Sequence, residues 1–245
     1  MAYPKFKQKH LQKALFKPMD IVKYKEISKN FPKKYIFIYQ SSALKFIQRK
    51  YKPKKLKKSI AHAAIYKYKN IGFVKMNGIG CPHATIVLET LIALGGKIFL
   101  NIGVAGGLCH EGIFLCQKAL RDEGTSYHYI AHGYFSYPDE KLTKKLGKVI
   151  EKQGLEYFNG ATWTIDAPYR ETNAEVEKYS KKGISTVEME ASAIFAVAKL
   201  RKVKIASAFV VSDILGKNWE PKFHEYGVKR AINKLLDAAV ECLIK

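Results

Sequence analysis

The stretch "GISTVEMEASAIFAVAKLRKVKIASAFVVSD", residues 183–213, decides the fold class of this chain. Both of its ends are rich in β-branched residues, and its middle is an alanine-rich apolar segment. Composition and length therefore predict a strand, a helix and a second strand, near 183–188, 190–201 and 204–212. A unit of this kind builds a parallel sheet with a covering helix, so the stretch predicts an α/β protein.

The same alternation extends over most of the chain. Buried strands are predicted at "KYIFIYQ" (34–40) and "KIFLNIGVAGGL" (97–108), and "AAIYKYKNIGFVKM" (63–76) predicts two strands joined by a tight turn. Further strands are predicted near 113–118 and 156–163, and further helices near 42–50, 77–96, 139–153, 171–181 and 222–244. The pattern predicts a single α/β domain with a central, mixed and mostly parallel twisted sheet flanked by helices.

Composition narrows the class of protein. With 245 residues, 47% of them hydrophobic, the chain is globular rather than disordered. It contains no apolar run of about 18 residues, the length that crosses a bilayer, and its start has no apolar leader segment. Its four cysteines lack metal-ligand spacing, which predicts reduced thiols in a cytoplasmic protein without a disulfide framework, metal centre or cofactor.

Positive charge is concentrated in the first part of the chain. The net charge is +22, and residues 1–70 carry 20 of the 43 basic residues but only 2 of the 21 acidic ones. The densest run, "RKYKPKKLKKS" (49–59), fits either a polyanion site or a solvated basic loop. Few of its basic residues are arginine and no aromatic platform accompanies it, which favours the solvated loop. Neither a nucleic acid nor a membrane is therefore an expected partner.

Segments with unusual chemistry end four of the predicted strands: "GIGCP", "NIGVAGG", "STVEME" and "FVVSD". Ligands gather at the carboxyl ends of parallel strands, so these segments are expected to converge. Together with "ATWTIDAPYRET", in this order and spacing, they resemble the nucleoside phosphorylase superfamily over about residues 34–240. That superfamily includes hexameric purine nucleoside phosphorylases, uridine phosphorylases and methylthioadenosine-type nucleosidases. The resemblance implies a phosphorylase-like three-layer fold, with a basic arm (1–33) before a catalytic domain (34–245).

The resemblance also implies a site for a small-molecule nucleoside. It places Glu190 on the ribose hydroxyls, with Met189 packed under the sugar and Glu188 in a lesser role. Asp213, oriented by Ser212, is expected to protonate N7 of a departing purine. Breaking an N-ribosidic bond builds positive charge on the ribose while electrons move to the base. A carboxylate at the sugar and an acid at the base suit that reaction.

Further roles follow from the same resemblance. Trp163 takes the place of an aromatic residue that stacks on the base. His10 is the positional candidate for a contact from a neighbouring subunit to the sugar 5′-hydroxyl, which implies a dimer-based homo-oligomer such as a hexamer. Asp213 favours a purine over uridine, although "RDEGTSYHY" (121–129) resembles the uridine phosphorylase branch.

The phosphate pocket departs from the family pattern. Phosphorylases of the family bind phosphate with P-G-D-P-x-R and with R-x-G-[ST], whereas this chain has Ala43 in place of the first arginine. In "LNIGVAGG", Asn101 replaces the second arginine and Val104 the hydroxyl residue. An arginine fork is the usual bidentate partner of phosphate, so its loss matters. The remaining candidates for an acceptor loop are Gly80, Asn101, Gly103, Arg121 and Arg170.

Three functions therefore stay open. Phosphorolysis of a nucleoside to ribose 1-phosphate and free base, with inorganic phosphate as co-substrate, is favoured. The second half of the chain looks most like phosphorylases, and the basic region offers an anion partner. Hydrolysis with water as the acceptor is the second function. The third is a non-catalytic basic protein that binds nucleotides or RNA, because a fold does not by itself determine function.

Overall fold

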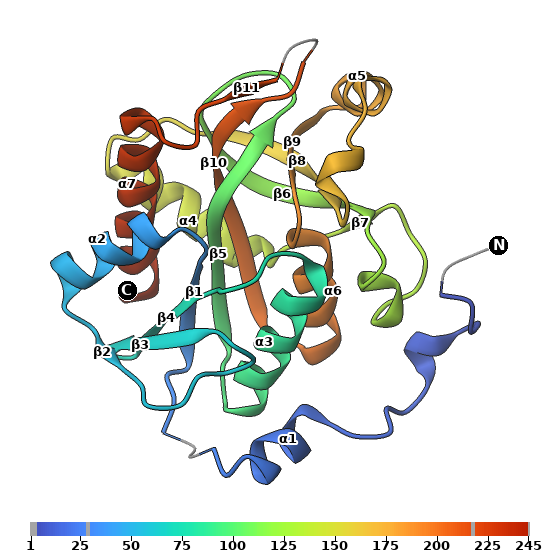
Figure 1. Cartoon of the computed structure of the whole chain (residues 1–245), viewed down its shortest axis with the longest axis vertical. Coiled ribbons are helices and arrows are strands. Elements are labelled where there is room, and N and C mark those ends of the chain that lie inside the picture. The colour runs from blue at the N-terminus through green and yellow to red at the C-terminus, as the bar shows by residue number, and fades with distance from the viewer. Residues whose placement is uncertain (1–3, 28–29, 217–218, 245) are drawn as a thin grey trace.

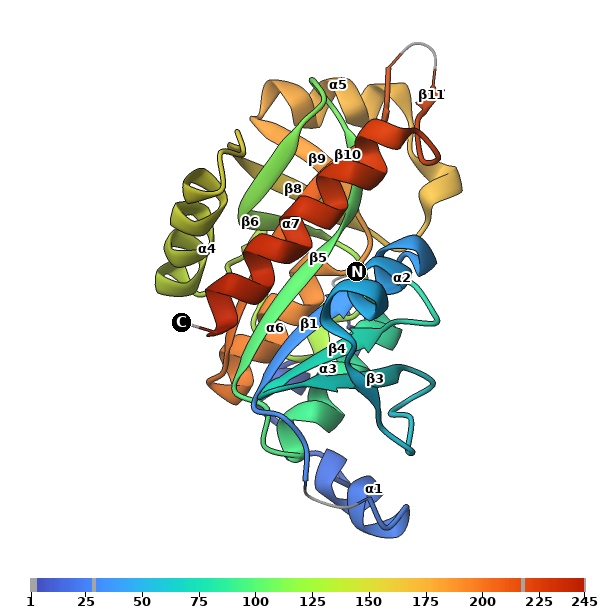
Figure 2. The same cartoon turned by 90° about the vertical axis from the view of Figure 1, so that its left-hand side faces the viewer.

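The computed structural model describes residues 4–27, 30–216 and 219–244, and it consists of one large mixed sheet between two layers of helices (Figure 1). One face is covered by α2 (Ser41–Tyr51), α4 (Glu140–Lys152) and α7 (Tyr226–Ile244) (Figure 2). The other is covered by α1 (Pro18–Tyr24), α3 (Cys81–Ala93) and α6 (Ala191–Arg201), while α5 (Asn173–Lys181) lies at one end. The predicted α/β fold in three layers is confirmed.

The strands form two parallel groups joined by antiparallel seams. In chain order the longer strands are β1 (Lys34–Ile38), β3 (Ala64–Tyr68), β4 (Ile71–Lys75), β5 (Ile98–Gly107), β6 (Ile113–Asp122), β8 (Phe158–Ile165), β9 (Ile184–Glu188) and β10 (Lys204–Ile214). Strands β4, β1, β5 and β10 are parallel neighbours, as are β6, β8 and β9. Antiparallel pairing of β10 with β6 and of β5 with β9 closes a ring of five strands.

The buried strands are apolar on both faces because helices cover both. In β1 the side chains of Ile36 and Ile38 pack on the side of α2 and α7, whereas Tyr35 and Phe37 pack on the side of α3 and α6. All four side chains are fully buried. This explains why the central strands are continuous hydrophobic runs in the sequence instead of alternating ones.

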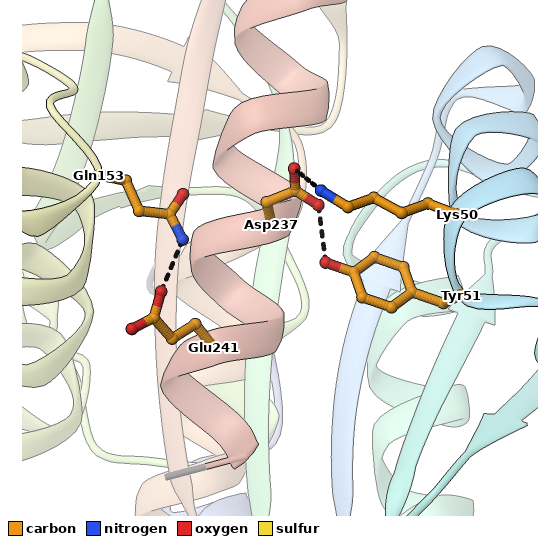
Figure 3. A network of polar contacts seen from close by, with 5 residues as sticks. All are labelled: Lys50, Tyr51, Gln153, Asp237 and Glu241. Atoms are coloured by element: carbon orange, nitrogen blue, oxygen red, sulfur yellow. Dashed lines mark hydrogen bonds and ion pairs between the residues drawn. The ribbon is translucent and has the colours of Figure 1, made fainter.

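Helix α7 is tied to both of its neighbours by polar contacts (Figure 3). Asp237 accepts hydrogen bonds from Nζ of Lys50 at 2.5 Å and from the hydroxyl of Tyr51 at 2.7 Å, both on α2. One turn further along α7, Glu241 accepts a bond from the amide of Gln153 at 2.9 Å, next to α4. These contacts hold α7 to α2 and to the end of α4, while the apolar faces of the three helices pack on the sheet.

The structure contains short elements that the sequence pattern did not predict. They are α1 and the two-residue strands β2 (Lys54–Lys55), β7 (Phe135–Ser136) and β11 (Glu220–Pro221). Strand β2 is exposed at one edge of the sheet and contains part of the basic run, where lysines discourage pairing with another chain. Within the described part of the chain, no helix is long and apolar enough to cross a membrane.

The N-terminal arm packs onto the domain. Val22 of α1 and Ile27 are buried in the same apolar cluster as α3. Residues 1–3 and 28–29 of the arm lie outside the described residues. The predicted boundary at residue 33 stays a prediction.

The ion pair between α3 and α6 gives a test of this packing. Glu89 is buried and accepts two hydrogen bonds from Arg201, each 2.8 Å long. We expect Glu89→Ala to lower the free energy of unfolding by about 1–2 kcal/mol in urea titrations, because it removes a bidentate, partly buried contact. The matched control is Glu140→Ala, which removes an exposed pair with Lys144 and is expected to change the free energy of unfolding much less, because solvent screens that pair. Equal losses in the two variants would contradict the interpretation.

Candidate active site

The carboxyl ends of β1, β5, β9 and β10 open into one cavity of about 700 Å³. The segment around α5 and the hairpin of β10 and β11 form its other walls. A cavity of this size and position is typical of a small-molecule site in an α/β fold. Its lining includes Tyr39, Asn101, Gly103, Glu171, Glu188, Met189, Glu190, Ser212, Asp213 and Trp219.

Ser212 and Asp213 both face this cavity because β10 is irregular at that point. In a regular strand, successive side chains point to opposite faces. The register of β10 against β5 shifts between Val211 and Asp213, which is the signature of a bulge, and bulges re-aim side chains next to binding sites. Oγ of Ser212 donates to Oδ1 of Asp213 at 2.9 Å. The predicted orienting contact between the two residues is therefore present.

Glu188 holds the start of α6 in place. Its Oε2 accepts the backbone N–H groups of Glu190 and Ala191 at 2.8 and 2.7 Å, and its Oε1 accepts the hydroxyl of Thr164 at 2.6 Å. These N–H groups lie at a helix start, where no preceding carbonyl can accept them. Glu188 is therefore the capping carboxylate of α6, even though it also lines the cavity.

Glu190 and Met189 lie in the turn that Glu188 fixes. Oε1 of Glu190 accepts the backbone N–H of Gly80 at 2.5 Å, which joins the turn to the start of α3. The backbone carbonyl of Met189 accepts the thiol of Cys81 at 3.1 Å, and its side chain lines the cavity. The sequence prediction brought Glu190, Met189 and Asp213 together, and the structure places all three on one cavity. Their chemical roles stay predictions.

The cavity is strongly acidic. Its described lining residues include Glu171, Glu188, Glu190 and Asp213 but no lysine, arginine or histidine. Burial raises the pKa of Glu188, and the neighbouring Glu190 raises it further. Burial likewise raises the pKa of Glu190. Among the described residues, no group of three or more His, Cys, Asp and Glu side chains is arranged to hold a metal ion.

The glycine-rich segment predicted as a loop is the carboxyl half of β5, and close packing shapes it. A Cβ on Gly106 would clash with Leu215 and would lie 2.9 Å from Cγ1 of Val187. Asn101 is held by the hydroxyl of Tyr39, which donates to Oδ1 at 2.8 Å, and by Oγ of Ser207, which accepts from Nδ2 at 3.3 Å. This part of β5 therefore brings backbone close to the cavity, and the side-chain amide of Asn101 is already hydrogen-bonded.

Trp163 does not take the predicted place against a base. It is fully buried in β8, donates its indole N–H to Asp122 at 2.9 Å, and packs edge-on against Tyr179 of α5 with a centroid distance of 4.8 Å. Trp163 lies outside the cavity lining, so the predicted stacking is wrong. The side chain belongs instead to the small apolar cluster between the sheet and α5.

Neither predicted arginine reaches the cavity. Arg121 is buried, and its guanidinium donates to Oγ of Ser126 at 2.8 Å and to the carbonyl of Ala131 at 2.7 Å. Arg170 is exposed in the short helix Pro168–Arg170, and only its neighbours in sequence line the cavity. Neither arginine lines the cavity, and their role as ligands of an acceptor stays a prediction. Of the other loop candidates, Asn101 and Gly103 line the cavity, and Gly80 binds Glu190.

His10 and the homo-oligomer concern a second subunit and stay predictions. Within the chain, the segment Lys9–Leu11 contacts the short helix Ser126–His128, away from the cavity.

Glu171 and Trp219 are two of the cavity residues that the sequence prediction missed. Glu171 comes just before the capping box of α5, in which Thr172 and Glu175 bind each other, and this box was the available signal. Trp219 follows Asp213 by six residues and is 62% exposed, although it lines the cavity. A tryptophan in a polar hairpin beside a candidate acid was the signal for the second residue.

The sequence is similar to those of curated nucleoside phosphorylases. The sequence is 30% identical over 138 residues to a guanosine phosphorylase of Halorubrum lacusprofundi. This alignment covers 55% of this chain and 57% of that protein. It is 27% identical over 152 residues to a uridine phosphorylase of Thermococcus kodakarensis, covering 55% of each. The chain thus spans little more than half the length of these two curated relatives.

Solved structures share the fold. A purine nucleoside phosphorylase from Toxoplasma gondii, in complex with immucillin-H, superposes with a TM-score of 0.76 at 18% identity, covering 86% of this chain and 90% of that one. An AMP nucleosidase from Bacteroides thetaiotaomicron has the same TM-score and identity, covering 94% and 99%. The family described as the Phosphorylase superfamily matches residues 41–243. With residues 41–243 matched, the chain belongs to the Phosphorylase superfamily.

Proposed function

We propose that this chain cleaves the N-ribosidic bond of a nucleoside. The observation that carries the proposal is that Glu190, Met189 and Asp213 line one cavity, although a helix separates them in the sequence. As the bond breaks, positive charge grows on the ribose and electrons move into the base. In this proposal Glu190 accepts hydrogen bonds from ribose hydroxyls and favours the growing charge, while Met189 packs against the sugar. Asp213 gives a proton to the departing base.

The base in this proposal is a 6-oxopurine, and guanine fits best. Glu171 and Asp213 both line the cavity and interact electrostatically. If Asp213 donates to N7, an ionised Glu171 offers two acceptor oxygens to another edge of the ring. Guanine has two adjacent donors there, N1–H and the 2-amino group, whereas adenine has one donor beside an acceptor and uracil has no N7. The relative named guanosine phosphorylase supports the same choice.

Water is the acceptor that the cavity favours. A phosphate dianion would meet four acidic side chains and no cationic side chain among the described lining residues. Water carries no charge, and an ionised Glu190, whose pKa is raised by burial, can take a proton from it. This reverses the preference that the sequence suggested. Phosphorolysis is the second candidate, because two relatives are named guanosine and uridine phosphorylase.

A panel of nucleosides separates these candidates. Guanosine, inosine, adenosine and uridine are incubated with the purified chain, with and without phosphate, and free base and sugar are quantified. We expect guanosine to be the best substrate and guanine and ribose to appear without phosphate. Release that requires phosphate and yields ribose 1-phosphate would establish the second candidate. No release, together with salt-sensitive retention of RNA, would establish a binding protein instead.

The acid role of Asp213 is tested by Asp213→Asn. We expect kcat for guanosine to fall by about 10²- to 10⁴-fold while KM changes by less than about threefold, because the amide keeps the shape but cannot supply the proton. Asp20→Asn is the matched control. Asp20 accepts the backbone N–H of Lys17 in the N-terminal arm, outside the cavity lining, and its variant is expected to keep the wild-type kcat. Equal losses in kcat/KM from binding alone would remove Asp213 from the acid role.

The role of Glu171 in choosing the base is tested by pH. Burial, with smaller contributions from Asp213 and Glu175, raises the pKa of Glu171 to about 7. Above that pH the side chain is a double acceptor, and below it the carboxyl is protonated and loses one acceptor. The ratio of kcat/KM for guanosine over adenosine is therefore expected to rise between about pH 6 and pH 8. In Glu171→Gln the ratio should fall by about 10-fold or more and lose this rise. A variant with the wild-type ratio would show that Glu171 does not read the base.

A further inference from the structure

Trp219 binds the carboxylate that the proposed function makes the acid. Its indole Nε1–H donates to Oδ2 of Asp213 at 2.9 Å, while Oγ of Ser212 donates to Oδ1 at the same distance. Both oxygens of Asp213 therefore have a donor, one from its own strand and one from the hairpin that follows. A carboxyl group held at both oxygens cannot rotate freely about its Cβ–Cγ bond.

The hairpin of β10 and β11 carries Trp219 back over the end of β10. Asp213 pairs with Pro221, and the backbone N–H of Lys222 donates to the carbonyl of Ser212 at 2.8 Å. Trp219 comes directly before β11, so this register brings its indole to the side chain of Asp213. The ring also lies 6.2 Å from that of Phe223, which lines the same cavity. The position of the indole is thus set by backbone pairing.

The exposure of Trp219 shows that the residue is not there to fill the core. The side chain is 62% exposed, whereas the other tryptophan, Trp163, is fully buried. An exposed indole N–H can bind water at little cost, but Asp213 is only 8% exposed and has few alternatives to a protein donor. A hydrogen bond to a buried carboxylate is also stronger than one in water. Asp213 therefore depends on this hydrogen bond for a partner more than Trp219 does.

We propose that Trp219 is a positioning residue for Asp213 in the cleavage reaction. This inference rests on the proposed function and deepens it. When the N-ribosidic bond breaks, its electron pair passes to the base, and the proton of Asp213 passes to a ring nitrogen. Asp213 is then left as a carboxylate. The donors of Trp219 and Ser212 are already in place to stabilise that charge, so no groups need to reorganise in the transition state.

Two substitutions separate the indole N–H from the ring. Trp219→Phe keeps an aromatic ring on the cavity wall and removes the donor, whereas Trp219→Gln keeps an N–H donor and removes the ring. We expect Trp219→Phe to lower kcat for guanosine by about 10-fold or more with KM within about threefold of wild type. Trp219→Gln is expected to keep more of kcat and to raise KM. Tyr226→Phe, an exposed aromatic residue outside the cavity lining, is the control and should match wild type.

A wild-type kcat in Trp219→Phe, or an equal loss of kcat in both variants, would overturn this inference while leaving the proposed function intact. A wild-type chain that releases no base from any nucleoside would instead overturn the proposed function.

The bond itself is open to a measurement that needs no turnover. The chain has two tryptophans, so an ¹H–¹⁵N spectrum contains two indole N–H resonances. The one that is absent in Trp219→Phe should move upfield in Asp213→Ala, because its acceptor is removed. A resonance that stays in place would show that the contact is not formed in solution.

Discussion

The candidate site depends on one buried carboxylate, that of Glu188. It joins β9, β8 and α6 by accepting the hydroxyl of Thr164 and the first backbone N–H groups of the helix. Those N–H groups have no carbonyl partner of their own, so the bonds both satisfy the helix start and fix the turn into it. Met189 and Glu190 lie in that turn. The direction in which both side chains point is therefore set by Glu188.

Charge is divided between the outside and the inside of the molecule. The sequence has no acidic residue between Glu26 and Glu89, and some lysines of this region bind backbone carbonyls, as Lys58 does with those of Lys25 and Glu26. The cavity has the opposite character, with four carboxylates among its described lining residues. Where these groups are ionised, such a cavity repels anions and stabilises positive charge that develops in a bound molecule. In the proposed function, positive charge of this kind develops on the ribose.

The limits of sequence-based prediction are physical. Strands β1, β5 and β10 were predictable because they are buried on both faces and leave continuous apolar runs. Strands β2, β7 and β11 have two residues each and no periodic signal, because their partners determine their pairing. Only residue type and position in the sequence predict Trp163 and Arg121 as site residues. In the structure, Trp163 packs in an apolar cluster and Arg121 donates to a loop carbonyl. No local sequence pattern predicts either contact.

The sequence by itself determined the alternation of strands and helices, because burial and periodicity produce recognisable patterns within each segment. It also placed a glutamate, a methionine and an aspartate at the ends of strands. Only the tertiary structure decided which side chains share the cavity. The bulge in β10 turns Ser212 and Asp213 to the same side, and the register of the following hairpin brings Trp219 onto Asp213. Glu171 reaches the same cavity from the segment before α5. Such directions arise from pairing between distant strands, so they are absent from any single stretch of residues.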